Sequence, residues 1–167
     1  SPLEFTGDEE RSTTGVYRWS SDYLKLKSWE VGTNASIGKT EISHLLDDGM
    51  GGVYALGLAC VGADEPCQLL VQPNRENAIT EQFVLEQPQV GGTAFLLHLK
   101  SDSSTAVIAQ VASDCQQADC LVENVALHRI GQRLIWTTMI GGPHIFLGGL
   151  GGSSTQVGGD NEESTVV

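Results

Sequence analysis

Short apolar stretches recur along the chain about every ten residues, and turn-forming residues separate them. This spacing is typical of an antiparallel β-sandwich or of a jelly-roll-like barrel. We therefore predict an all-β fold of about eight to ten short strands, with flexible acidic termini. Besides the arms of two hairpins described next, the predicted strands lie within residues 16–31, 40–46, 78–86, 93–100, 121–130, 132–140 and 144–147, with a single helical turn as the alternative for 40–46. The segments 121–130 and 132–140 flank Gly131 and predict a further hairpin.

The stretch 51–71, GGVYALGLACVGADEPCQLLV, predicts a β-hairpin. Two apolar arms rich in β-forming residues flank a short acidic loop, with Cys60 and Cys67 at its two ends. Cysteines on paired strands lie at a distance that a disulfide can bridge. Closing so small a ring stabilises the fold by about 2 to 3 kcal/mol, and we expect it to pin the tip of the loop.

A second stretch, 105–125, TAVIAQVASDCQQADCLVENV, repeats this arrangement with Cys115 and Cys120. We predict a disulfide within each pair, which indicates an oxidising, extracellular environment. Closely spaced reduced thiols are the alternative. A zinc site ranks below both, because the C-x6-C and C-x4-C spacings depart from the C-x2-C knuckles of zinc ribbons.

The segment 93–100, TAFLLHLK, is apolar on both of its alternating faces. A strand of this kind is covered on both sides, at a subunit contact or beneath a loop. We take this pattern as the main support for self-association, and expect a homo-oligomer.

The two ends of the chain are polar and acidic, whereas its middle has the strand pattern. At 167 residues the chain fits one domain with a core of its own. We predict a polar linker at 1–15, one β domain at 16–150 and a flexible Gly/Ser-rich acidic tail at 151–167. The net charge of −12 disfavours nucleic acid and anionic membranes as partners, and the chain has no apolar run of 18 residues that would predict membrane insertion.

Three aromatic residues are the candidate ligand-binding residues. Trp19, Tyr23 and Trp29 lie near a polar turn, where aromatic faces can stack on sugars or anchor a partner protein. The alternative is that all three belong to the core of the sandwich.

Two polar motifs suggest other sites. Asp47 and Asp48 precede glycines and could offer oxygen ligands to calcium, although their spacing is not that of an EF-hand, so a solvated turn is the alternative. The triplet Asn34-Ala35-Ser36 is an N-glycosylation sequon, which has meaning only in a secreted protein and is otherwise a chance match.

Catalytic signatures are missing from the chain. It has no G-x-S-x-G elbow, H-E-x-x-H motif, P-loop or dinucleotide fingerprint, so we predict no catalytic residues and no cofactor. His98 stands near Asp102 and Ser103, but three residues within six positions do not make a triad. The histidines have no metal-ligand spacing and are expected to be structural or surface residues; they are His44, His98, His128 and His144.

These observations favour a non-catalytic surface or assembly domain that acts by self-association and by binding a glycan or protein receptor. A polar arm followed by a β domain and a Gly/Ser-rich end is also the layout of an outward-projecting module of a viral capsid or a cell-surface protein. The expected location is therefore extracellular or on a virion surface. One alternative is a secreted hydrolase with carboxylates from separate strands. The other is a secreted protease inhibitor that presents the clamped loop at Val61–Pro66.

Overall fold

The computed structural model describes residues 13–34, 39–61, 67–85, 92–112, 122–131, 133–140, 144–149 and 155–157. Within these ranges the chain forms twelve strands, and none of the described residues belongs to a helix able to cross a membrane. The strands are β1 (Thr14–Trp19), β2 (Leu26–Thr33), β3 (Lys39–Asp47), β4 (Val53–Val61), β5 (Gln68–Pro73), β6 (Glu81–Val84), β7 (Thr93–Leu99), β8 (Thr105–Ala112), β9 (Val122–Ile130), β10 (Arg133–Ile140), β11 (His144–Gly149) and β12 (Thr155–Val157).

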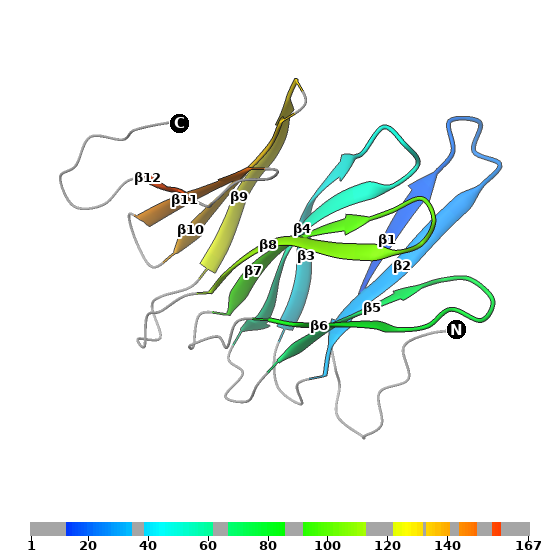
Figure 1. The fold of residues 1–167 in the computed structure, drawn as a ribbon, viewed down its shortest axis with the longest axis horizontal. Helices are drawn as coiled ribbons and strands as arrows, with labels where there is room; N and C mark the ends of the chain where they lie inside the picture. Colours follow the sequence, from blue (N-terminus) through cyan, green and yellow to red (C-terminus); the bar gives the residue numbers. More distant parts are fainter. Residues whose placement is uncertain are drawn as a thin grey trace.

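The strands form three antiparallel sheets of four strands each. The first sheet has the order β1-β2-β5-β6, the central sheet β3-β4-β7-β8 and the third sheet β12-β11-β10-β9. In Figure 1 the central sheet lies between the other two. The predicted all-β, antiparallel sandwich is therefore confirmed. The sheets do not close into a barrel, because each keeps two edge strands.

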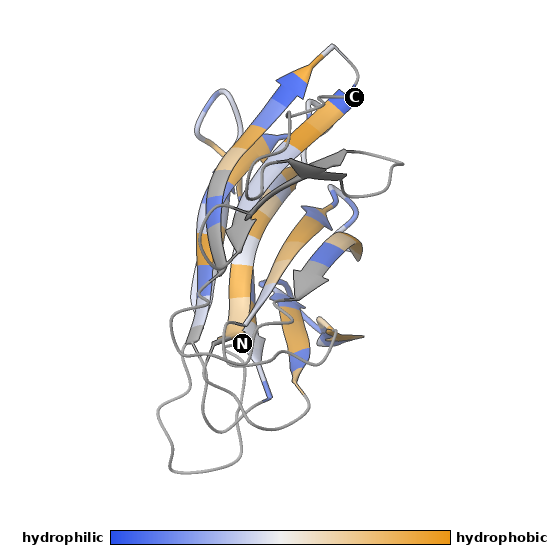
Figure 2. Cartoon of the chain, turned by 90° about the vertical axis from the view of Figure 1, so that its left-hand side faces the viewer, coloured by the Kyte–Doolittle hydropathy of each residue, from blue (hydrophilic) through white to orange (hydrophobic). Residues whose placement is uncertain are grey.

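One hydrophobic core separates the first sheet from the central sheet. Residues of β2 and β5 supply one side of it, and alternate residues of β4 and β7 supply the other. Figure 2 shows the alternation of apolar and hydrophilic residues along several strands that produces such faces. Large buried side chains of this first core are Trp29, Val31, Leu69, Val71, Phe95, Leu97 and Leu99.

A second core lies between the opposite face of the central sheet and the third sheet. Its buried members are Tyr54, Leu56, Ala94, Leu96, Leu127, Leu134 and Trp136. The strand β7 contributes to both cores, since Phe95 belongs to the first and Leu96 to the second. The prediction that this strand is covered on both sides is confirmed, but the cover comes from two sheets of the same chain rather than from a subunit contact or a loop.

The two predicted cysteine hairpins are wrong. The strand β4 pairs with β3 and β7, whereas β5 pairs with β2 and β6, so the connection between β4 and β5 passes from the central sheet to the first sheet. In the same way β8 pairs with β7 and β9 pairs with β10, in different sheets. The strands that flank each cysteine pair therefore belong to different sheets and do not form a hairpin with each other.

Several strands that follow one another in sequence do pair, and the hairpin predicted around Gly131 is among them. Antiparallel hairpins join β1 to β2, β3 to β4 and β9 to β10. Gly131 provides the turn of the last hairpin, with a φ of 61° that glycine adopts without strain. The strand β12 at Thr155–Val157 pairs with β11, so regular structure extends into the segment that we predicted to be a flexible tail.

Candidate functional site: an exposed aromatic hairpin

The hairpin of β1 and β2 gathers large hydrophobic side chains on the surface. Five of the ten exposed large hydrophobic residues in the described part of the chain lie between positions 17 and 26. Single exposed apolar residues are ordinary, but contiguous ones mark interaction sites. We call these five residues the aromatic hairpin surface; they are Tyr17 (62% exposed), Trp19 (53%), Tyr23 (76%), Leu24 (81%) and Leu26 (45%).

The pleat of β1 explains why its aromatic residues point outward. Val16 is 1% exposed and belongs to the first core, so the positions on either side of it face away from that core. Trp19 stands directly opposite Leu26 in the ladder, which places their side chains on one face. Tyr17 lies over Gly15, where an added Cβ would come within 2.8 Å of Cε2 of the tyrosine ring.

The turn between the strands is held by its own hydrogen bonds. The amide of Ser20 donates to the Lys25 carbonyl at 2.8 Å, and the amide of Tyr23 donates to the Ser20 carbonyl at 2.9 Å. The Leu24 amide donates to Oδ1 of Asp22 at 3.1 Å, and the Ser20 hydroxyl donates to the same oxygen. The Ser20 hydroxyl and the Leu24 amide lower the pKa of the Asp22 carboxyl from its usual value. Tyr23 and Leu24 are thus displayed from an ordered turn.

Two contacts fix the hairpin against the central sheet. Nε of Arg18 forms an ion pair with Oδ2 of Asp47 at 2.9 Å, and Nζ of Lys27 donates to the Ser101 carbonyl. With Lys25, positions 17–27 carry three cationic side chains and one carboxylate, and Asp47 adds a second carboxylate through its pair with Arg18, which leaves a local charge of +1 in a chain of −12. The aromatic hairpin surface is therefore locally basic on an acidic protein.

The structure separates the three predicted aromatic residues. Trp19 and Tyr23 belong to the exposed surface, whereas Trp29 is 1% exposed and packs in the first core. Successive residues of a strand face opposite sides, and Trp29 lies on the side of β2 that faces the first core. For Trp29, the alternative that it is a core residue is therefore correct. Sequence reasoning missed Tyr17, Leu24 and Leu26, which became visible only once the phase of the two strands was known.

The predicted calcium ligands point to different partners. Asp47 forms an ion pair with Arg18. The buried Asp48 is hydrogen-bonded through Oδ2 to Nε2 of His98, at 2.8 Å. Oδ1 of Asp48 also accepts from the amides of Met50 (2.7 Å) and Gly52 (2.8 Å). Among the described residues no group of three His, Cys, Asp or Glu side chains could hold a metal ion.

The electrostatics of Asp48 follow from these contacts. Burial raises the pKa of its carboxyl, but the hydrogen bonds from His98 and from two turn amides lower it by more, so that the pKa lies below the ordinary value of 3.8. His98 stacks on Tyr54, with ring centroids 4.4 Å apart. Arg129 lies over the Tyr54 ring and donates to the Asp48 carbonyl at 3.3 Å. This network connects the central sheet to the third sheet.

Neither alternative function gains a described site. Asp102, which stands near His98 in sequence, instead accepts hydrogen bonds from the amide and hydroxyl of Ser104. A surface hollow of about 690 Å³ has one carboxylate in its lining, whereas glycoside hydrolysis needs two. That lining consists of Gln72, Asn74, Arg75, Glu76, Asn77 and Ala78. The loop proposed for protease inhibition lies outside the described residues at positions 62–66.

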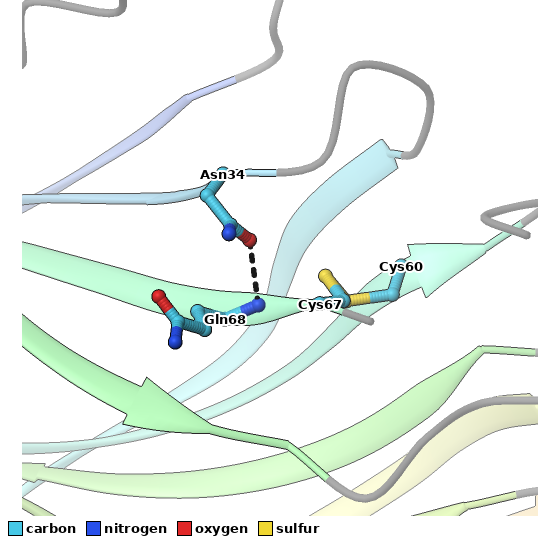
Figure 3. The surroundings of a disulfide bond; sticks show 4 residues. All are labelled: Asn34, Cys60, Cys67 and Gln68. Atoms are coloured by element: carbon cyan, nitrogen blue, oxygen red, sulfur yellow. Dashed lines mark hydrogen bonds between the residues drawn. A yellow bond between two sulfur atoms is a disulfide. The ribbon is translucent and has the colours of Figure 1, made fainter. Parts of the chain in front are cut away.

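The first cysteine pair forms the expected bond in an unexpected place. Cys60 and Cys67 are joined by a disulfide with Cα atoms 6.2 Å apart, and both are buried in the first core. Because Cys60 lies in β4 of the central sheet and Cys67 immediately precedes β5 of the first sheet, the bond connects two layers. Figure 3 shows it beside Asn34, the sequon residue, which contacts the strand that begins after Cys67. Cys115 and Cys120 lie outside the described residues.

Comparisons with protein-family models, with curated proteins and with solved structures found no match to this chain.

Proposed function

We propose that this protein is an extracellular recognition module that binds a partner protein through its aromatic hairpin surface, without catalysis. The observation that carries the proposal is the concentration of five exposed large hydrophobic side chains on one ordered hairpin. Exposed clusters of this kind on a water-facing surface mark places where a partner docks. An outward-projecting module of a viral capsid or of a cell-surface protein would offer the hairpin to a receptor in this way.

A protein partner suits the chemistry of the surface better than a glycan. Tyrosine and tryptophan are enriched at the energetic centres of protein interfaces, and aliphatic side chains complete their apolar cores. Leu24 is 81% exposed at the tip, and the Ser20 hydroxyl and Oδ1 of Asp22 beside it form hydrogen bonds within the turn, which leaves them less available to sugar hydroxyls. The charges of Lys25 and Lys27, which exceed that of Asp22, favour a partner whose apolar site has an acidic rim.

The sequence pattern that suggested self-association has another explanation in the structure. The two-sided apolar pattern of β7 is accounted for by the two cores of one chain, so this strand leaves no apolar face for a second copy. A second copy therefore becomes an outcome to be tested. The disulfide between Cys60 and Cys67 is compatible with the extracellular location of the proposal.

Selection of random peptides displayed on phage tests this function with a defined probe. We expect peptides selected on the wild-type protein to combine acidic residues with Leu, Phe or Trp. Trp19→Ala and Tyr23→Ala should each weaken a selected peptide about tenfold or more in fluorescence anisotropy, because truncation of a central aromatic anchor removes more than about 1.4 kcal/mol. Ile130→Ala is the matched control, since Ile130 is 64% exposed on a different sheet, and it should change the affinity by less than about twofold.

Three results would argue against the proposal. Equal effects of Trp19→Ala and Ile130→Ala would remove the hairpin from the binding site. Sugar binding on a glycan array that disappears in Trp19→Ala would identify a glycan receptor instead. A dimer in sedimentation that dissociates on the same substitution would identify a second copy as the occupant. Near-ultraviolet circular dichroism checks that each variant keeps the fold.

A further inference from the structure

Asn34 occupies an exposed position at the end of β2, where the first sheet meets the disulfide. Its amide donates to the Gln68 carbonyl at 3.2 Å, and its Oδ1 accepts from the Gln68 amide at 2.7 Å. Figure 3 shows Oδ1 directed toward Gln68, with Nδ2 at the other end of the side-chain amide. Within the described part of the chain, Nδ2 has no hydrogen-bond partner. Asn34 is also exposed, so the atom to which an N-linked sugar is attached is clear of the described residues, and a glycan added before folding is compatible with the fold.

The disulfide between Cys60 and Cys67 is a second observation in favour of a glycan at Asn34. Gln68 directly follows Cys67, so the bond between Cys60 and Cys67 fixes the start of β5. The first residue of that strand, Gln68, forms the hydrogen bonds with Asn34. Such a bond persists in the secretory pathway and at the cell surface. N-glycosylation takes place in that pathway, and the sequon Asn34-Ala35-Ser36 is the only one in the 167 residues.

We propose that Asn34 carries an N-linked oligosaccharide. In the transfer, Nδ2 loses one proton and attacks the anomeric carbon of an oligosaccharide linked to a lipid pyrophosphate. The nitrogen–carbon bond forms, the bond from that carbon to the pyrophosphate oxygen breaks, and the lipid pyrophosphate leaves. Oδ1 takes no part in the new bond, so the contact with Gln68 remains in the modified protein.

The glycan and the aromatic hairpin surface lie at opposite ends of β2. Eight residue steps separate Asn34 from Leu26, which corresponds to about 26 Å at roughly 3.3 Å per residue. A glycan on Asn34 therefore shields the end of the molecule that contains the disulfide and leaves the hairpin tip accessible. The modification itself does not depend on the proposed binding function.

Secretion from eukaryotic cells with a signal peptide, followed by peptide-N-glycosidase treatment, tests the modification. We expect the wild-type protein to lose mass and to convert Asn34 to Asp in the peptide mass spectrum. Ser36→Thr keeps a sequon and should behave like the wild type. Ser36→Ala destroys the sequon while leaving Asn34 and Gln68 in place, and should lack the glycan, as should Asn34→Gln.

A wild-type protein without glycan would overturn the proposal, whether it is recovered from the medium or from inside the cells. Both fractions are measured because transfer precedes folding, so a variant that is retained still reports on the sequon. If peptides bind the hairpin, the glycosylated and enzymatically deglycosylated proteins should bind them with affinities within about twofold of each other. A large difference would contradict the separation of the glycan from the hairpin, and would leave the modification itself established.

Discussion

Asp48 is a buried carboxylate with hydrogen bonds on both oxygens. Oδ1 holds the turn between β3 and β4 through the amides of Met50 and Gly52, and Oδ2 connects this turn to His98 on β7. Gly52 leaves space for the carboxylate, because a Cβ there would run into Oδ2 of Asp48 and the carbonyl of Leu99. One side chain thus organises a turn and joins it to the middle of the central sheet.

The depressed pKa of Asp48 makes part of the stability dependent on pH. A carboxyl whose pKa is lower in the folded state stabilises the fold above its unfolded pKa of about 3.9, and that contribution is lost as the pH falls through the folded value. Asp48→Asn removes the charge, and should lower the free energy of unfolding at pH 7 by about 1.5 to 3 kcal/mol. Urea unfolding at pH 7 and at successively lower pH values below 4 measures both effects.

The difference between Asp48→Asn and the wild type should shrink as the pH falls below about 4, since the wild-type carboxyl becomes neutral as well. Asp102→Asn is the control, because Asp102 is also an aspartate in a turn with a lowered pKa but is solvent-exposed. It should change stability at pH 7 by much less than Asp48→Asn. A constant difference across the pH range would contradict the assignment of this effect to the ionised carboxylate.

The pairing of Asp48 with His98 had no signal in the sequence. The two residues are 50 positions apart, and the acidic turn 47–52 has the composition of a solvated loop. Only the pairing of β4 with β7 brings this turn to the residues that follow Leu97. Trp19 and Tyr23, by contrast, were identified from sequence because they flank a local turn, although their exposure depended on the phase of the strands.

At the scale of elements, the disulfide between Cys60 and Cys67 connects two sheets rather than the arms of a hairpin. Cys60 is the second-last residue of β4 and lies where the register of β4 with β3 shifts, and its φ of 64° is a left-handed conformation that is unfavourable for a residue with a side chain. Cys67 lies next to β5 in the first sheet. The bond thus fixes a sharp passage of the chain from one layer to the next.

Removal of the disulfide should destabilise the protein, and the left-handed conformation offers a matched comparison. Cys60→Ala with Cys67→Ala should lower the free energy of unfolding by about 2 to 3 kcal/mol, as expected for a closed loop of this length. Cys60→Gly with Cys67→Ala should be more stable than that double variant by about 1 kcal/mol, because glycine adopts a positive φ without strain. Guanidinium unfolding of both variants under one set of conditions measures the two differences. Equal stability of the variants would show that position 60 leaves the left-handed region once the bond is absent.

Strands were easier to predict than their partners. Alternation and turn residues located β2, β3, β7, β9 and β10, because these signals are local. The choice of partner depends on which faces and edges remain uncovered in the assembled sheets. The strand β4 has β3 on one edge and β7 on the other, which leaves no edge for β5 despite the short connection between them.

At the scale of the whole molecule, the central sheet is the layer on which both cores depend. Its strands β4 and β7 send alternate residues to opposite sides, as in Tyr54 to the second core and Ala55 to the first. The sequence indicated such two-sided burial, but it could not distinguish a third layer of the same chain from a second subunit. Both give the same apolar pattern, since a side chain is buried equally by either.

This arrangement predicts that the three sheets unfold together. Loss of the third sheet would expose the apolar side chains of Tyr54, Leu56 and Leu96, and the distortion would pass through β7 to the first core. Two tryptophans report on the cores separately, because Trp29 lies in the first and Trp136 in the second. Trp19→Phe with Trp29→Phe leaves Trp136 as the probe, and Trp19→Phe with Trp136→Phe leaves Trp29.

Within each of these variants, the urea transition followed by tryptophan fluorescence should coincide with the transition followed by far-ultraviolet circular dichroism. Comparing two probes in one variant removes the stability differences that the substitutions themselves introduce. Leu134→Ala in the second core should lower the midpoint reported by Trp29 as much as that reported by Trp136, with a loss of about 2 to 5 kcal/mol. If Trp136 fluorescence changed at lower urea than the circular dichroism signal, the third sheet would be an independent unit docked on a two-layer sandwich.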